Sequence, residues 1–273
     1  MGAAAATSWP ADLRSRQRGC AALPHRYTHS MTATQPSPRL NEYGQPIGPA
    51  LPDWTPRPRP PRTLMSGRFC QVVPLDPEAH AANLYELYAG APDRSGWTYL
   101  VDDLPATAAA YRERLDKQAA GEDPLFHTIL DGQSGKPLGI ASYLRIDPGN
   151  GVIEVGHIHF GHGLKRRAAA TEAMALMMAR AFDELGYRRY EWKCDSLNAP
   201  SRAAALRYGF RFEGIFRNAV VVKGRSRDTA WYSVTDAEWP ALRDAFAAWL
   251  DPSNFDAEGQ QRRGLAAMRG EAG

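Results

Sequence analysis

The sequence predicts one mixed α/β domain, in which helices flank a central sheet of about seven strands whose fourth strand is bulged. Two observations lead to this class. From about residue 63, apolar residues recur with a period of two in some segments and at helical spacing in others. Residues 1–62 lack such periodicity and hold eleven of the 21 prolines, so we expect an extended or disordered segment there. The domain should span residues 63–252, followed by a polar tail at 253–273.

Composition restricts the function classes. Residues 1–62 carry eight arginines against three acids, or +5, and the rest of the chain therefore carries −2 of the overall +3. The predicted domain is not basic, so we expect no nucleic-acid partner. No apolar run approaches the roughly 20 residues of a membrane span, so no membrane partner is expected. The three cysteines are widely spaced, which indicates a reducing, cytoplasmic location without a disulfide framework.

The domain begins with a strand and two helices. "RFCQVVPL" is typical of a strand. The helix after it should open at Asp76, with Pro77 in its first position, and end at Gly90. "LPATAAAYRERLDKQAAG" predicts a second helix, closed by Gly121.

Three strands follow, and the third of them is irregular. "LFHTILD" and "PLGIASYLRID" predict two strands joined by the turn "GQSGK", and "GVIEVGHIHF" predicts the next. Its apolar residues change register between Val155 and Ile158, which requires an inserted residue, so a β-bulge is expected near Gly156–His157. A bulge would bend the strand away from its neighbour and open a cleft. The alternative is a strand buried on both faces, where register carries little information.

The second half of the domain alternates again between helices and strands. A long helix should end at Gly186, and "YRRYEWKCD" places Tyr190, Trp192 and Cys194 on one strand face with Arg189, Glu191 and Lys193 on the other. The remaining elements are a short helix, a closing hairpin and a last helix, in "APSRAAALRYG", "FRFEGIFRNAVVVKG" with "RDTAWYSVTD", and "DAEWPALRDAFAAWL".

Three cations lie at the N-terminus of the long predicted helix, where the helix dipole is least favourable to positive charge. Lys165, Arg166 and Arg167 directly precede the long helix. The first turn of a helix has about four unpaired N–H groups and roughly half a positive charge, so it attracts anions and repels cations. A bound anion such as a pyrophosphate would reconcile these charges. A solvated basic turn is the alternative.

These features resemble the GCN5-related N-acetyltransferases (GNAT), in particular the RimJ/RimL-like branch. The family's pyrophosphate loop, Gln/Arg-x-x-Gly-x-Gly/Ala followed by Thr-Glu-Ala, falls on Lys165-Arg166-Arg167-Ala168-Ala169-Ala170 and Thr171-Glu172-Ala173. A second signature, Asn-x-x-Ser leading to Gly-Phe, falls on Asn198 to Ser201 and on Gly209-Phe210. The resemblance covers about residues 64–250 and implies a GNAT fold, acetyl-CoA as the acyl donor and a primary amine as the acceptor.

The sequence departs from the family pattern at three positions. Lys165 replaces Gln or Arg, and Ala168 replaces the loop glycine, which matters only if that residue needs a positive φ. Many relatives have a tyrosine general acid four residues before Gly-Phe, where this chain has Ala205. The resemblance therefore implies Ser201 as the donor to the leaving thiolate.

The resemblance also implies roles for residues around the bulge. Glu154 is the expected general base, with Glu191 on the neighbouring strand as the alternative. A backbone N–H of His159 or Phe160 would stabilise the oxyanion. Asn198 is expected to hold the pantetheine arm, to cap the helix after it, or both. The acceptor would be a protein N-terminus or a small-molecule amine, and the enzyme a monomer or homodimer.

Two other readings of the sequence remain open. His157, His159 and His162, with Cys194 on the next strand, could form a metal site, although no carboxylate second shell is evident and we expect no metal. The degenerate loop also allows a non-catalytic acyl-CoA-binding module. The aromatic stretch "DRSGWTYL" falls where the family lines its acceptor pocket, although aromatic residues more often belong to a core.

Overall fold

A computed structural model describes residues 39–164 and 167–270 and divides the chain into two units, Met1–Asp53 and Trp54–Gly273. The described part of the first unit is a small antiparallel hairpin of β1 (Arg39–Leu40) and β2 (Pro46–Ile47). All other described elements belong to the second unit.

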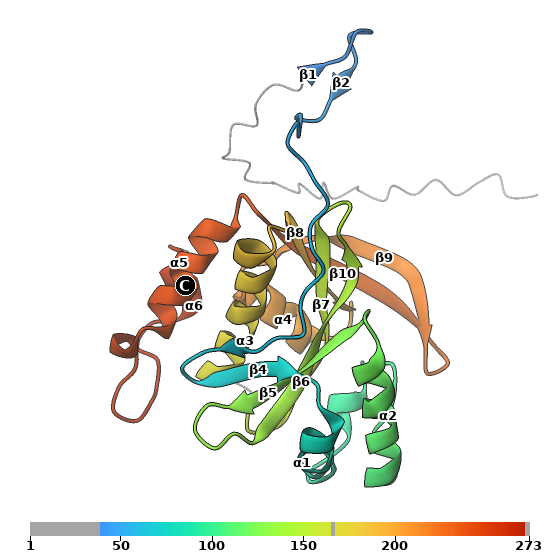
Figure 1. Cartoon of the computed structure of the whole chain (residues 1–273), viewed down its shortest axis with the longest axis vertical. Coiled ribbons are helices and arrows are strands. Elements are labelled where there is room, and N and C mark those ends of the chain that lie inside the picture. Colours follow the sequence, from blue (N-terminus) through green and yellow to red (C-terminus); the bar gives the residue numbers. More distant parts are fainter. Residues whose placement is uncertain (1–38, 165–166, 271–273) are drawn as a thin grey trace, which may run out of the picture. The chain divides into compact units, whose positions relative to one another are not determined.

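The second unit is built on one sheet of eight strands in the order β3-β4-β5-β6-β7-β8-β10-β9 (Figure 1). Every neighbouring pair is antiparallel except β7 and β8, which are parallel. The seven predicted strands are all present, and the eighth is the two-residue β3. The strands are β3 (Met65–Ser66), β4 (Cys70–Pro74), β5 (Leu125–Asp131), β6 (Pro137–Asp147), β7 (Val152–Phe160), β8 (Arg189–Asp195), β9 (Arg211–Val222) and β10 (Arg225–Thr235).

The helices begin and end close to the positions that the sequence predicts. Asp76 caps α1 by accepting hydrogen bonds from the N–H groups of Glu78 and Ala79, with Pro77 as the first helical residue. Gly186, with φ of 69°, ends the long central helix after a π-helical turn. The helices are α1 (Pro77–Ala89), α2 (Ala108–Ala120), α3 (Ala168–Ala179) with its π-helical continuation (Arg180–Glu184), α4 (Ala199–Arg207), α5 (Trp239–Leu250) and α6 (Leu265–Met268).

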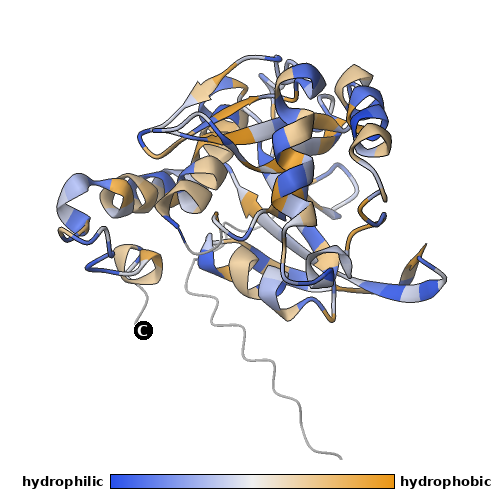
Figure 2. Cartoon of the chain, turned by 90° about the horizontal axis from the view of Figure 1, so that it is seen from below, coloured by the Kyte–Doolittle hydropathy of each residue, from blue (hydrophilic) through white to orange (hydrophobic). Residues whose placement is uncertain are grey.

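The two faces of the sheet carry separate cores. Leu125 belongs to the large core that includes the buried residues of α3 and α5, whereas its neighbour Phe126 packs with α1 and α2. Successive residues of a strand point to opposite faces, so α1 and α2 cover one face while α3 and α5 cover the other. The helices carry both hydrophobic and hydrophilic residues, as expected of elements with one buried side (Figure 2).

The segment just before the predicted domain start packs against it. Trp54 donates from Nε1 to the carbonyl of Gly149 at 2.9 Å, and the backbone N–H of Arg57 donates to Pro148 at the same distance. Pro60 is buried. The predicted boundary at residue 62 stays a prediction, and these contacts favour a boundary near Trp54. At the other end, α6 lies in the predicted polar tail and buries Leu265.

The fourth large strand, β7, is bulged as predicted. Gly156 pairs with Ser142 of β6 and His159 pairs with Ile140, so three steps along β7 match two along β6. The extra residue is accommodated at His157, whose φ is +48°. The structure therefore confirms the bulge at Gly156–His157.

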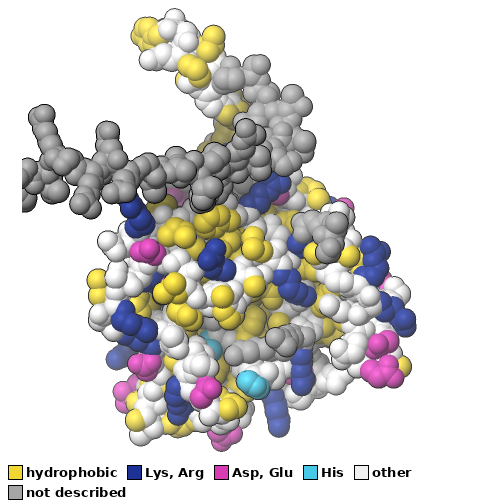
Figure 3. All heavy atoms as spheres, turned by 180° about the vertical axis from the view of Figure 1, so that it is seen from behind, with side chains coloured by type: hydrophobic (Ala, Val, Ile, Leu, Met, Phe, Trp, Pro, Cys, Tyr) yellow, Lys and Arg dark blue, Asp and Glu magenta, His cyan; other side chains and the backbone are white. Residues whose placement is uncertain are grey.

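The described helices and one face of the surface bear on the membrane and charge arguments, and the absence of a membrane or nucleic-acid partner stays a prediction. Among the described residues, no helix is long and apolar enough to cross a membrane. On the face shown in Figure 3, Lys and Arg side chains are scattered among apolar and acidic ones.

Candidate active site

The site is centred on the point where β7 leaves β8. The two strands pair only from Val152 to Val155 on β7, which lie opposite Arg189 to Trp192 on β8. Beyond Val155, β7 continues along β6 through its bulge, while β8 continues along β10. The last pairs before this divergence include Glu154 opposite Glu191, so both predicted base candidates lie at the divergence.

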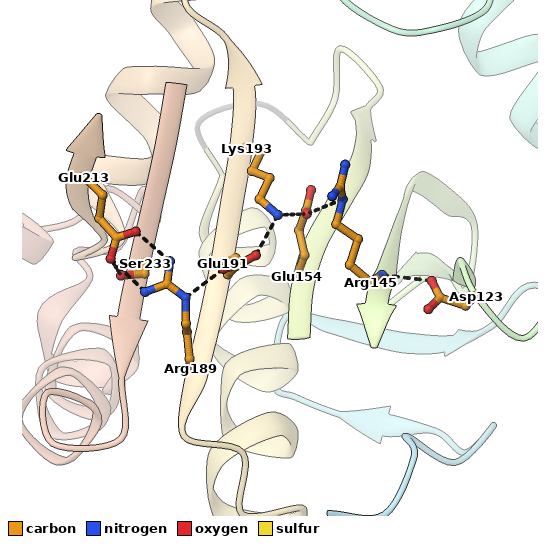
Figure 4. A network of polar contacts seen from close by, with 8 residues as sticks. All are labelled: Asp123, Arg145, Glu154, Arg189, Glu191, Lys193, Glu213 and Ser233. Atoms are coloured by element: carbon orange, nitrogen blue, oxygen red, sulfur yellow. Dashed lines mark hydrogen bonds and ion pairs between the residues drawn. The ribbon is translucent and has the colours of Figure 1, made fainter. Parts of the chain in front are cut away.

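A row of alternating charges crosses the sheet at this place, on the face that α1 and α2 partly cover (Figure 4). The Lys193 ammonium lies 2.9 Å from Glu154 Oε2 and 2.7 Å from Glu191 Oε2. Arg189 binds Glu191 at 2.7 Å and Glu213 at 2.6 Å. At the other end, Arg145 Nε lies 3.3 Å from Glu154 Oε2. Both buried carboxylates of this row, Glu154 and Glu191, therefore have a cation beside them.

Glu154 is buried, and its environment suits proton transfer. Burial raises the pKa of its carboxyl above the ordinary value, while the nearby charges of Lys193 and Arg145 act against this rise. Both ion pairs reach Oε2. The other oxygen, Oε1, lies beside Gly156, where an added Cβ would stand 3.5 Å from it. Glu154 thus presents one oxygen toward the bulge and holds cations with the other.

The bulge contacts Trp97, which belongs to the aromatic segment where the family resemblance implies an acceptor pocket. The ring of His159 stacks on Tyr88 with centroids 4.0 Å apart, and Trp97 meets it edge-on at 4.3 Å. His157 Nδ1 lies 2.8 Å from the hydroxyl of Ser142. A cavity of about 50 Å³ lies here between β7 and the α1–α2 connection, and its lining includes Trp97, Asp102, His157 and His159. Trp97 is therefore both a core residue and a wall of this cavity.

Phe160 and His159, the two oxyanion candidates, are the last residues of β7. Phe160 pairs with Gly139 and His159 with Ile140 of β6, and neither has a register partner on β8. The side of β7 that faces away from β6 is thus not paired with β8 at this level. The oxyanion role of either N–H remains a prediction.

Ser201 and Asn198 lie at the start of α4, on the other arm of the divergence. Asn198 is the N-cap of α4, and its side chain accepts from the Ser201 N–H at 3.1 Å, so the predicted capping role is confirmed. Trp192 Nε1 donates to Ser201 Oγ at 3.0 Å. This bond uses the hydroxyl as an acceptor, and the hydroxyl also makes a hydrogen bond with the Cys194 side chain. The predicted contacts of both residues with the donor substrate remain predictions.

The predicted pyrophosphate loop leads into the start of α3. Lys165 and Arg166 lie outside the described residues. Arg167 is exposed and is the N-cap of α3, and Ala168 is already the first helical residue. Ala168 therefore does not need a positive φ, and alanine is the better residue for that position by about 1 kcal/mol. The Ala170 N–H bonds to the Arg167 carbonyl, and the N–H groups of Ala168 and Ala169 belong to the first turn of α3, where a helix favours an anion.

The residues that follow in the same motif have structural contacts. Thr171 is buried, and its hydroxyl accepts from Arg207 Nη1 of α4 at 3.0 Å. Glu172 accepts from the backbone N–H groups of Arg68, Phe69 and Cys70 at 2.7, 2.6 and 2.8 Å. Glu172 thus fixes the start of β4 to α3, a role that the motif comparison did not assign. The predicted contact of Thr171 with the donor substrate remains a prediction.

The histidines do not form a metal centre in the described part of the chain. Within residues 39–164 and 167–270, no group of three or more His, Cys, Asp or Glu side chains could hold a metal ion. Cys194 instead packs in the large core, and burial raises the pKa of its thiol.

Sequence reasoning missed the cations that surround the base candidates. Lys193 and Arg145 both contact Glu154, and neither was singled out. The alternation in "YRRYEWKCD" already placed Glu191 and Lys193 on one strand face. The pairing of β7 with β8 was the missing information, because only the register brings Glu154 to the same place.

Known proteins resemble this chain in fold and in sequence. The family model described as Acetyltransferase (GNAT) domain matches residues 71–211. A crystal structure of a GCN5-related N-acetyltransferase from Brucella melitensis is 50% identical, with a TM-score of 0.79, over 81% of this chain and 100% of that one. A GNAT-family structure from Chromobacterium violaceum is 40% identical, with a TM-score of 0.68, over 72% and 98% of the two chains.

A curated relative points in the same direction. The Bacillus subtilis (strain 168) protein provisionally named ribosomal N-acetyltransferase YdaF is 28% identical over 170 residues, which are 60% of this chain and 90% of the relative. The chain belongs to the GNAT family and is an acetyl-CoA-dependent acyltransferase.

Proposed function

We propose that the protein transfers the acetyl group of acetyl-CoA to a primary amine, either a protein N-terminus or a small-molecule amine, by direct attack. The observation that carries this proposal is the buried Glu154 carboxylate at the divergence of β7 and β8, with Oε1 beside the bulge. The name of the Bacillus subtilis relative, a ribosomal N-acetyltransferase, supports an amine of the ribosome among the possible acceptors.

Acetyl-CoA would lie across the divergence. The N–H groups at the start of α3, together with Lys165, Arg166 and Arg167, are suited to the pyrophosphate, since a helix N-terminus and cations both favour an anion. Asn198 and the end of β7 would line the pantetheine arm. Arg207, which reaches the first turn of α3 through Thr171, is a further cation close to this place.

The chemical step needs a base, because an amine at neutral pH is mostly ammonium and cannot attack a thioester. Glu154 accepts a proton from the ammonium, directly or through a water molecule. The amine nitrogen then bonds to the thioester carbon, and the negative charge that develops on the carbonyl oxygen is stabilised by the N–H of His159 or Phe160. When the tetrahedral intermediate collapses, the carbon–sulfur bond breaks, and the nitrogen gives its second proton to the departing thiolate, directly or through a water molecule, so that the neutral amide and the free thiol form. Glu154 then returns its proton to solvent.

Ser201 would serve the leaving group. The thiolate sulfur gains stability from a hydrogen bond. The Ser201 oxygen accepts from Trp192, and its hydroxyl, which also makes a hydrogen bond with the Cys194 side chain, would turn its proton to the departing sulfur. Tyrosine cannot play this part at the family's usual position, which is occupied here by the buried Ala205.

The alternative is a non-catalytic acyl-CoA-binding module. Its motivation was Ala168 in place of the loop glycine. Since Ala168 is helical, this substitution does not distort the loop, and the alternative loses its main support. We also infer that the described domain works without a metal and without nucleic acid, while the oligomeric state and a cytoplasmic location stay predictions.

Two measurements test the proposal. Isothermal titration calorimetry should show CoA binding that weakens when Arg166 and Arg167 are both replaced by Glu, and unchanged affinity would refute the loop assignment. A panel of peptide and small-molecule amines with acetyl-CoA should include amines that accelerate thiol release. CoA binding without acceleration by any amine would favour the non-catalytic module.

A further inference from the structure

The ammonium of Lys193 has an unusual place for a lysine. Its side chain is 6% exposed, and Nζ lies between the carboxylates of Glu154 and Glu191 and 3.7 Å from the centre of the Trp231 ring. Lysine is rarely buried unless it is paired. Its three contacts come from three strands, β7, β8 and β10, so the position of the ammonium is determined by the sheet itself.

The two carboxylates need this cation to different degrees. Glu154 and Glu191 are in register on neighbouring strands, where like charges would repel each other. Glu191 has a second cation, Arg189, at 2.7 Å with a side chain that is only 26% exposed. The second cation of Glu154 is Arg145, at 3.3 Å and 63% exposed, so water screens its charge. Loss of Lys193 would therefore affect Glu154 more than Glu191.

The orientation of Glu154 depends on the same contact. Lys193 and Arg145 both bind Oε2, which leaves Oε1 next to Gly156 at the bulge. Figure 4 shows Lys193 and Arg145 approaching Glu154 from opposite sides. Lys193 is the buried one of the two cations, so water cannot loosen its contact with Glu154.

We propose that Lys193 is a positioning residue, which keeps Glu154 ionised and turned with one oxygen toward the bulge so that it can accept the proton of the acceptor amine. This inference rests on the proposed role of Glu154 as the base. Lys193 acts through Glu154 and need not touch either substrate.

The charged groups that face Glu154 define the expected pH dependence. They are Lys193 and Glu191 of β8 and Arg145 of β6, and burial is the main influence that raises the Glu154 pKa. Lys193 lowers that pKa, so its removal must raise it. The proton-accepting form would then appear only at higher pH, and the acid limb of the rate profile would move upward.

The test compares Lys193→Met with the wild type and with Lys136→Met, which removes one exposed cation from the β5–β6 turn. Titration of ¹³C-labelled glutamate side chains by NMR, with the Glu154 resonance assigned by Glu154→Gln, gives the midpoint directly. We expect Lys193→Met to raise the Glu154 midpoint by roughly one to three pH units, the usual effect of an opposite charge at this distance. Lys136→Met should leave it unchanged.

The same proteins are then assayed with acetyl-CoA and the fastest amine of the panel. Deprotonation of the amine affects both proteins equally. The ratio of the Lys193→Met rate to the wild-type rate should therefore rise with pH, as Glu154 of the variant becomes ionised. Lys193→Gln is measured in parallel in case the Met variant does not fold. Coincident Glu154 midpoints in the wild type and the Lys193 variant would overturn the inference. Full activity of Glu154→Gln would instead refute the base, and the midpoints would still report on Lys193, so the two failures are distinguishable.

Discussion

Glu154 and Glu172 are equally buried, at 5% exposure each, but their surroundings differ completely. The Glu172 carboxylate accepts three backbone N–H groups from the start of β4. The Glu154 carboxylate faces the side-chain cations of Lys193 and Arg145 instead. One carboxylate joins two parts of the backbone, and the other lies among side chains at the divergence of two strands.

This contrast distinguishes a carboxylate that stabilises the fold from a carboxylate that can take part in catalysis. Backbone donors cannot move away, so the three N–H groups hold the Glu172 carboxylate in place and occupy both of its oxygens. A carboxylate whose contacts all reach one oxygen keeps the other for chemistry. Burial alone would have ranked the two residues as equal.

Replacement of Glu172 by Ala should produce the largest loss of stability. The change leaves three backbone N–H groups without their acceptor. Each buried donor left unsatisfied costs about 1–3 kcal/mol, so we expect a total loss of roughly 3–5 kcal/mol because water can reach some of them. For a domain of this size that corresponds to a fall in melting temperature of roughly 10 °C. Differential scanning calorimetry measures it, with Glu86→Ala on the exposed side of α1 as the control. A melting temperature equal to that of the control would show that Glu172 is not the structural acid.

Replacement of Ser201 by Ala should have a smaller effect, on turnover. The variant loses one hydrogen bond to the departing sulfur, which is worth about 1–1.5 kcal/mol or roughly tenfold in rate. Raising the pH should not relieve the defect, because no proton acceptor has been removed. Trp192→Phe is the matched control, since it deletes the same Trp–Ser hydrogen bond and keeps the hydroxyl. Equal losses in the two variants would place the effect in that hydrogen bond and not in the leaving group.

Local signals explain why most of the fold was predictable. Helix ends are determined by neighbouring residues, such as Asp76 with Pro77 at the start of α1, and they appear where expected. The register change inside "VIEVGHIHF" located the bulge, because a strand period of two cannot slip without an inserted residue. The two-residue β3 was missed since so short a strand has no period to detect.

The partners within the site could not be predicted in the same way. The Glu154–Lys193 ion pair joins residues that are far apart in the sequence, and the parallel pairing of β7 with β8 brings them together. The backbone donors of Glu172 lie about a hundred residues before it. Packing of Trp54 on Gly149 is equally long-range, so composition alone could not separate residues 54–62 from the segment that precedes them.

The kinetics of Glu154→Gln report on the role of Glu154 as the general base. The amide keeps the shape of the side chain but cannot accept the proton, and general-base catalysis is typically worth about 10² to 10⁴ in rate. Burial raises the pKa of Glu154, so the ionised form adds no stability at neutral pH, and the variant should melt within a few degrees of the wild type.

We therefore predict that turnover of Glu154→Gln falls at least tenfold while its affinity for CoA is unchanged. The defect should shrink at high pH, where more of the acceptor amine is already deprotonated. Glu191→Gln, measured beside it, should lose less activity because the base remains. Full activity of Glu154→Gln together with an inactive Glu191→Gln would contradict the role of Glu154 as the base and place the base on β8.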